Sequence, residues 1–128
     1  MITSKKQGFI LAIIILIIDQ ISKLIVIQNF NFTTNTGAAW GMFKNSQILL
    51  MVIAFIAIFY VNRYFAYHPL AFSMLLGGIF GNLTDRIFRG HVIDFINIKV
   101  FNYPLFNFAD TFITISVFLI FIKVIKEK

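Results

Sequence analysis

The chain has 128 residues, of which 59% are hydrophobic and 12% are charged, whereas about a quarter of the residues of an ordinary soluble domain are charged. This composition leaves too little polar surface for a water-soluble globule, and the absence of cysteine excludes disulfides, thiol chemistry and cysteine-ligated metals. The net charge of +6 is spread along the chain, so we expect no basic face for a nucleic acid.

Four apolar segments predict an all-α membrane protein, a small bundle of membrane-spanning helices in one domain covering residues 1–128. When the polar residues at the ends of these segments are included, the spans are expected at about residues 8–27, 46–64, 69–88 and 107–124.

The first span follows Lys5 and Lys6 and could be interpreted as a secretory signal peptide. No small-x-small cleavage site follows it, and the apolar run resumes after Asp19, which favours a retained helix. Asp19 and Lys23 stand four residues apart with the acid first, the favourable order for an ion pair on one helix face. A pair at the membrane interface and a part of a functional site are equally good interpretations of this spacing.

A short strand and a turn are expected between the first two spans. Phe30 and Phe32 alternate with polar residues in segment 29–33, a weak two-residue period typical of a strand. The sequence TTNTGAAWG at 33–41 contains Asn and Gly, which tolerate unusual backbone angles, and Ala, which allows close approach of chains. By itself this segment indicates only a loop.

The second span contains an uninterrupted apolar run from Ile48 to Val61, which makes about 21 Å of helix against a hydrocarbon core of roughly 30 Å. We therefore expect the helix to include Ser46 and Gln47 before this run and Asn62–Tyr64 after it.

In the third span Gly78, Asn82 and Arg86 recur every four residues and share one helix face. The glycines indicate close helix packing whatever else this face does. Asp85 lies beside it, and the neighbouring Arg86 and Asn82 are expected to keep its carboxylate ionised and structural.

Two further carboxylates follow, Asp94 in the last loop and Asp110 in FNFAD at the start of the fourth span. An N-cap of the fourth helix is one interpretation of Asp110. His91 has no second histidine with which to bind a metal, so we expect it to face solvent in the loop.

The distribution of Lys and Arg predicts that both termini are cytoplasmic. Six of these residues lie on the side of the termini and three on the other side: Lys5, Lys6, Arg63, Lys123, Lys126 and Lys128 against Lys44, Arg89 and Lys99. With this topology four aspartates gather at the outer end of the bundle. Because an Asp at the centre of a membrane helix costs roughly 2.5–3.5 kcal/mol, such residues are candidates for a functional site.

The blocks DQISK, NTGAAWG, GGIFGNLTDRIFRGHVIDF and FNFAD, in this order and on alternating ends of four spans, resemble the bacterial lipoprotein signal peptidases, also called type II signal peptidases. The resemblance implies an aspartyl endopeptidase of the bacterial plasma (inner) membrane, with its active site at the extracytoplasmic face. It also implies a small extracytoplasmic sheet and a short helix beside the four spans. Its substrates would be diacylglyceryl-prolipoproteins, cut before the lipidated cysteine.

By motif position the catalytic pair would be Asp94 and Asp110. The residues expected to support them or to bind substrate are Asp19, Lys23, Asn35, Gly37, Ala38, Asn82, Asp85, Arg86, Asn107 and Ala109. Two carboxylates that share a proton can hydrolyse a peptide bond without a metal or other cofactor, so none is expected. Membrane lipids and the inhibitor globomycin are the other expected partners.

The chain departs from the family pattern in its loops. The segment from Lys23 to Asn35 and the loop from Asp94 to Asp110 are shorter than expected, and Trp40 stands where the family usually has Phe. We therefore expect a reduced extracytoplasmic sheet.

Two other classes of protein fit parts of this pattern. A small proton or ion conductor would line a relay with ionisable groups across the membrane, yet here the inner halves of the spans have none. A structural subunit would use polar residues to join helices, but it would not need two separate motifs that end in Asp.

Overall fold

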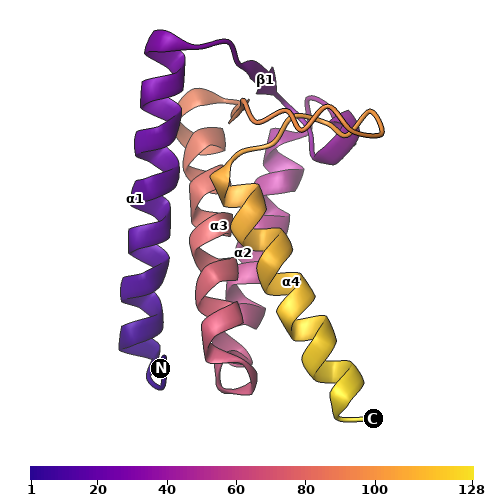
Figure 1. Ribbon diagram of the computed structural model, residues 1–128. Helices are drawn as coiled ribbons and strands as arrows, with labels where there is room; N and C mark the ends of the chain where they lie inside the picture. The colour runs from indigo at the N-terminus through magenta and orange to yellow at the C-terminus, as the bar shows by residue number, and fades with distance from the viewer.

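The computed structural model describes all 128 residues as four helices, two short strands and two 3-10 turns. In chain order the elements are α1 (Lys5–Asn29), β1 (Thr33–Asn35), η1 (Ala39–Gly41), α2 (Gln47–Arg63), η2 (Phe65–Tyr67), α3 (Pro69–Arg89), β2 (Val92–Asp94) and α4 (Phe108–Lys126). The helices run alternately in opposite directions, so both termini lie at one end of the bundle and the two strands lie at the other (Figure 1).

The helix boundaries have local causes. Ser4 and Gln7 form a capping box at the start of α1, in which each side chain accepts a backbone N–H of the other. Pro69 begins α3, and Gly90 ends it with the left-handed backbone (φ 76°) that glycine adopts most easily. The expected extension of α2 beyond its apolar run is confirmed for Gln47, Asn62 and Arg63, whereas Ser46 and Tyr64 are the caps of the helix and lie outside it.

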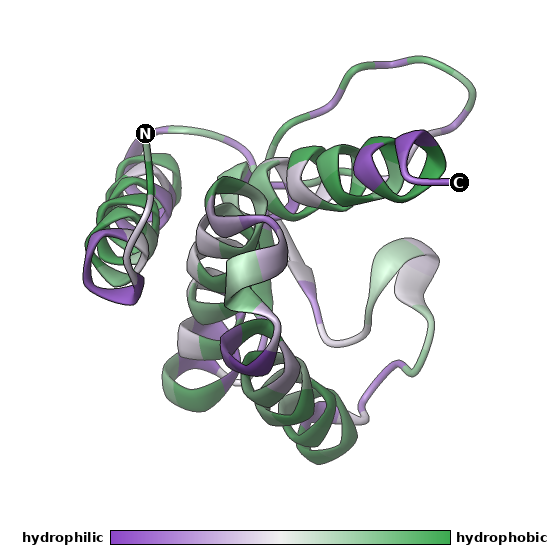
Figure 2. Ribbon diagram, turned by 90° about the horizontal axis from the view of Figure 1, so that it is seen from below, coloured by the Kyte–Doolittle hydropathy of each residue, from purple (hydrophilic) through white to green (hydrophobic).

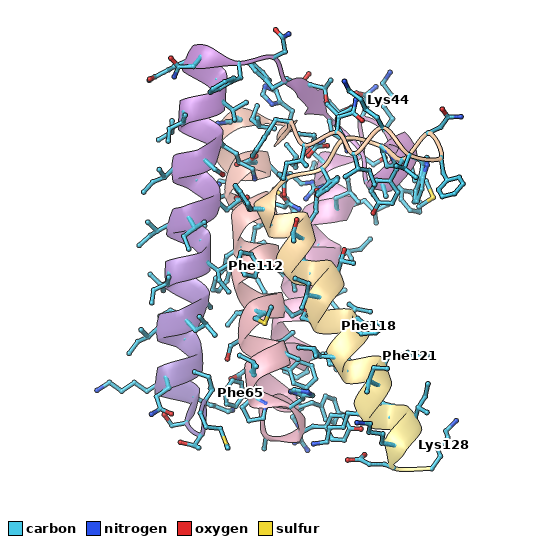
Figure 3. The ribbon with its side chains drawn as sticks, in the orientation of Figure 1. Lys44, Phe65, Phe112, Phe118, Phe121 and Lys128 are labelled. Atoms are coloured by element: carbon cyan, nitrogen blue, oxygen red, sulfur yellow. The ribbon has the colours of Figure 1, made fainter.

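Two helices, α1 and α4, are long and apolar enough to cross a membrane, with mean hydropathies of 2.6 and 2.1. Helix α2 is also apolar but has 17 residues. Hydrophobic residues occur along all four helices (Figure 2), and large ones are exposed, such as Phe118 and Phe121 on α4 (Figure 3). Soluble monomers rarely expose this much apolar surface, so these side chains are suited to contact with lipid.

Helix α3 is the centre of the bundle and packs against α1, α2 and α4. Its glycines allow this close approach. A Cβ atom on Gly77 would lie 2.7 Å from Cβ of Ile15, and one on Gly78 would lie 2.6 Å from the carbonyl oxygen of Ala109. The close packing predicted from these glycines is confirmed, and it brings the polar faces of α1, α3 and α4 together.

The two strands form an antiparallel pair in which Thr33, Thr34 and Asn35 lie opposite Asp94, Ile93 and Val92. The prediction of a strand at 29–33 is wrong, because the strand begins at Thr33. Pairing depends on the buried partner β2, and Phe30 lies outside its reach as the exposed C-cap of α1. With three residues in each strand, the sheet is small, as expected.

Candidate active site

A buried ionic cluster joins α1 to α3. Nζ of Lys23 lies 2.7 Å from Oδ2 of Asp19 and 3.0 Å from Oδ2 of Asp85, and all three side chains are fully buried. The ion pair predicted from the spacing of Asp19 and Lys23 is therefore confirmed. It belongs to the packed interior, where charges need partners, rather than to an exposed interface.

The partners expected for Asp85 were wrong. Its Oδ1 accepts hydrogen bonds from Nη1 of Arg89 (2.7 Å) and Nε2 of Gln20 (2.9 Å), and its Oδ2 accepts the backbone N–H of Ile93 (3.0 Å). Arg86 instead donates to the carbonyl oxygen of Gly37 (3.1 Å). On a helix, residues four apart face each other whereas adjacent residues do not, so Arg89 can reach Asp85 and Arg86 cannot.

Sequence reasoning missed Gln20 and Arg89 as members of this cluster. Nε2 of Gln20 also approaches Oδ2 of Asp19 (3.2 Å) and the carbonyl oxygen of Gly81 (3.1 Å). The available signals were the four-residue spacing between Asp85 and Arg89 and an amide side chain beside Asp19 in an otherwise apolar helix. Both carboxylate oxygens of Asp85 thus accept hydrogen bonds from the protein, in agreement with a structural role.

Asp94 is 4% exposed and is held by two amide side chains. Its Oδ1 accepts a hydrogen bond from Nδ2 of Asn107 (2.9 Å), and its Oδ2 accepts one from Nδ2 of Asn35 (3.2 Å). Asn35 is fixed in turn, because its Oδ1 accepts the N–H of Gly37 (2.8 Å) and its Nδ2 donates to the carbonyl oxygen of Ala38 (3.1 Å). The turn predicted in this segment therefore orients Asn35, which donates a hydrogen bond to Asp94.

Asp110 is not the N-cap of α4, which corrects that interpretation. Asn107 is the N-cap, with an extended backbone (φ −135°), and its Oδ1 accepts the N–H of Asp110 (2.9 Å). Oδ2 of Asp110 accepts the N–H of Asn107 (3.2 Å) and completes a capping box. Oδ1 of Asp110 accepts Nδ2 of Asn82 on α3 (2.8 Å).

Asn107 connects the two carboxylates. Besides Asp94, its Nδ2 contacts Oδ1 of Asn82 (3.1 Å) and the carbonyl oxygen of Ile93 (3.2 Å). The side chain is fully buried and its amide has one possible orientation, since the oxygen caps α4 and the nitrogen faces three acceptors. Asp94 and Asp110 are thus set in place by the same residue.

A cavity of about 300 Å³ lies between these elements. Seven of the twelve predicted site residues line it: Asn35, Gly37, Ala38, Asn82, Arg86, Asp94 and Asp110. The other five are buried around it: Asp19, Lys23, Asp85, Asn107 and Ala109. Ala109 has a defined contact there, because its backbone N–H donates to Oδ1 of Asp19 (2.9 Å).

His91 is half-buried and not the solvent-facing residue that was expected. Its Nδ1 is covered and has no hydrogen-bond partner. The left-handed turn at Gly90 leads the chain directly from the end of α3 into the buried strand β2, so His91 is partly covered at the junction.

Burial and the nearby charge of Asp110 raise the pKa of Asp94 from an ordinary 3.8 to about 6, against the opposing hydrogen bonds from Asn35 and Asn107. The carboxyl group therefore keeps its proton to a higher pH in the folded protein than in the unfolded chain. A neutral carboxylic acid beside a second carboxylate is the state that acid catalysis requires.

This raised pKa predicts how stability depends on pH. Between 3.8 and about 6 the folded protein binds more protons at Asp94 than the unfolded chain does, so its contribution to stability is complete below this window and is lost as the pH rises through it. Asp94→Asn removes this dependence. As the pH rises through this window, we expect the thermal midpoint of the variant, measured in detergent, to increase relative to that of the wild type. Plots of thermal midpoint against pH that run parallel for the two proteins would contradict the assignment.

Gly81 gives a second prediction. A Cβ atom there would lie 2.5 Å from Oδ2 of Asp19 and 3.0 Å from Cβ of Ala109. Because α1, α3 and α4 meet at this point, Gly81→Ala should destabilise the protein by about 1–3 kcal/mol and lower cleavage activity. Gly90→Asn is the control, since no atom lies within 4 Å of an added Cβ and Asn tolerates the positive φ (76°) of this position. A fully active and stable Gly81→Ala variant would show that the site does not need this packing.

The fold and the site define a membrane-embedded helical protein with two carboxylates in one polar cavity. The sequence model of the family described as signal peptidase (SPase) II matches residues 11–126, so the chain belongs to this family of proteases that process lipoproteins. Two solved structures described as bacterial membrane enzymes are similar, each with 27% sequence identity. One has a TM-score of 0.87 and the match covers 96% of this chain and 90% of that one; the other has 0.85, with 97% and 96% covered.

Proposed function

We propose that the protein is an aspartyl endopeptidase of the bacterial plasma membrane that removes the signal peptide from diacylglyceryl-modified prolipoproteins, cutting before the lipidated cysteine. The observation that carries this proposal is the pair Asp94 and Asp110, which line one cavity and both accept hydrogen bonds from Asn107. Family membership supports this class of substrate.

In the proposed reaction the two carboxyl groups share one proton, and Asp94 carries it before attack. The Asp110 carboxylate takes a proton from a water molecule, whose oxygen adds to the scissile carbonyl carbon while Asp94 donates its proton to the carbonyl oxygen. The resulting diol then collapses. Its C–N bond breaks as the cysteine nitrogen takes the proton held by Asp110, and a diol hydroxyl returns its proton to Asp94. The products are a free carboxyl group on the signal peptide and a free amine on the lipidated cysteine.

The surrounding residues orient this pair. Lys23 approaches Oδ1 of Asn82 (3.3 Å), which leaves Nδ2 of Asn82 to donate to Asp110. Arg86 also lines the cavity, and its Nε is buried without a partner in the protein. We assign this group to a substrate oxygen, either a peptide carbonyl or one of the lipid ester groups, because a buried donor without a partner costs free energy.

The direct test is to incubate the purified protein in detergent with a diacylated prolipoprotein, with and without globomycin. We expect a size shift that matches loss of the signal peptide and that globomycin prevents. Equal cleavage of the substrate without its lipid, or cleavage that globomycin leaves unchanged, would overturn the proposal.

Topology is a separate prediction. Reporter fusions after Lys128 and within 63–69 should be cytoplasmic, and fusions near Asn45 or Asn102 should be external. The arrangement in Figure 1, with both termini at the end opposite the strands, agrees with alternating spans. A cytoplasmic Asn102 would place the carboxylates on the wrong side of the membrane for an exported substrate.

A further inference from the structure

Two further cavities adjoin the catalytic one, and they differ in character. Asp110 also lines a cavity of about 210 Å³ whose walls include Ile98, Phe106 and Ile115. Asp94 also lines a cavity of about 310 Å³ bordered by three threonines, Thr33, Thr34 and Thr36. The catalytic carboxylates therefore stand where an apolar space meets a polar one.

The polar cavity, here called the β1 groove, lies along strand β1 and the loop after it. Its other walls include Trp40, Lys44 and Leu105. Lys44 lies at the end of the molecule that carries the strands, opposite Lys128 (Figure 3). The groove thus begins at a catalytic carboxylate and leads away from the apolar bundle.

One edge of β1 is free to pair with another chain. The N–H of Ile93 donates a hydrogen bond to Asp85, and its carbonyl oxygen accepts one from Asn107. These two groups are therefore not available for hydrogen bonds with Thr34, the residue opposite Ile93 in the antiparallel pair. The backbone groups of Thr34 therefore point away from β2, since residues alternate along such a ladder. Thr34 is exposed, so its N–H and C=O can pair with an extended peptide in the β1 groove.

Lys44 gives the groove a charge preference. It forms no ion pair or hydrogen bond with the protein, and it is the one cation among the residues that line the groove. An uncompensated ammonium group beside a peptide-sized hollow favours a carboxylate on the ligand.

We propose that the β1 groove binds the first residues of the mature lipoprotein, those just after the lipidated cysteine, as an extended strand, and that Lys44 selects an acidic side chain among them. This inference rests on the proposed function. The substrate has the same polarity as the site: the signal peptide and lipid match the apolar cavity beside Asp110, and the polar mature chain matches the groove beside Asp94.

The test uses the full-length protein in detergent and diacylated prolipoprotein peptides that differ only in charge. Glu, Gln or Lys is placed in turn at the second, third and fourth mature residues, and kcat/KM is measured for the wild type, Lys44→Glu and Lys99→Glu. Lys99 is the matched control, a lysine of the other loop that does not line the groove.

At one or more of these positions we expect the wild type to cleave the Glu peptide about three- to fivefold faster than the Lys peptide, the range of an exposed ion pair. Lys44→Glu should invert this ratio, Lys99→Glu should keep it, and added salt should shrink it. A ratio that is the same in the wild type and Lys44→Glu would overturn the inference. Failure of the wild type to cleave the Gln peptides would instead overturn the proposed function.

Strand pairing is tested on the substrate alone. Methylating one mature-chain peptide nitrogen at a time removes one donor, and the nitrogen that pairs with Thr34 should then show a fall in kcat/KM of up to about tenfold, as for one hydrogen bond. Equal rates at every methylated position would exclude pairing with β1.

Discussion

Asn in place of either Asp94 or Asp110 is expected to abolish cleavage, with kcat lower by at least about a thousandfold, and the double variant should be no worse than either single one. The reason is that the proposed chemistry needs one ionised and one protonated carboxyl group at the same time, so losing either removes the shared proton. All four carboxylate oxygens accept hydrogen bonds from amide groups, so each Asn must turn an NH₂ group toward another donor. Below the pH at which Asp94 ionises in the wild type, that mismatch should lower stability by only about 1 kcal/mol.

Asp85→Asn is the control that makes this comparison decisive. Asp85 bonds to Lys23, Arg89 and the backbone of Ile93, so its loss should destabilise the protein while leaving measurable turnover. The measurement is the single-turnover rate of purified variants at matched folded concentration, with thermal midpoints recorded on the same samples. Robust cleavage by Asp94→Asn, or a stable but inactive Asp85→Asn variant, would move the catalytic pair to Asp85 and Asp110.

The gathering of the polar residues at one end of the bundle could be predicted because alternating spans leave few arrangements. Asp19 late in the first span and Asp110 early in the fourth must meet at the same end whatever the details of packing. Helix periodicity also predicted the pair of Asp19 and Lys23, which the structure confirms. These predictions rest on short-range geometry along one helix and on the order of spans.

Contacts between elements could not be predicted in the same way. Asn107 and Asp110 are equally good N-caps by residue type, and what decides between them is the backbone at Asn107 together with the acceptors that Ile93, Asp94 and Asn82 place around its amide. Strand β1 likewise starts where β2 offers a partner, which the alternation of residues before Thr33 does not reveal.

Loss of Lys23 should have the largest effect on stability. The cluster contains two carboxylates, Asp19 and Asp85, and two cations, Lys23 and Arg89. Removing Lys23 leaves one uncompensated negative charge in the interior, and breaking a buried pair in this way costs about 3–5 kcal/mol. We expect Lys23→Ala and the less disruptive Lys23→Met to unfold at much lower temperature or denaturant concentration than the wild type, with Lys5→Ala at the exposed start of α1 as the unaffected control.

A charge-balanced variant separates electrostatics from packing at this position. Combining Lys23→Met with Asp19→Asn restores neutrality, so the double variant should recover about half of the stability that Lys23→Met loses. Activity should respond differently. Because Lys23 forms no direct hydrogen bond with Asp110 and is joined to it through Asn82, turnover by the folded fraction should fall by about tenfold, equivalent to one weakened hydrogen bond, and should not vanish. Complete loss of turnover in well-folded Lys23→Ala protein would show instead that Lys23 acts in the chemical step, and no recovery in the double variant would show that the packing of its side chain, and not its charge, holds α1 against α3.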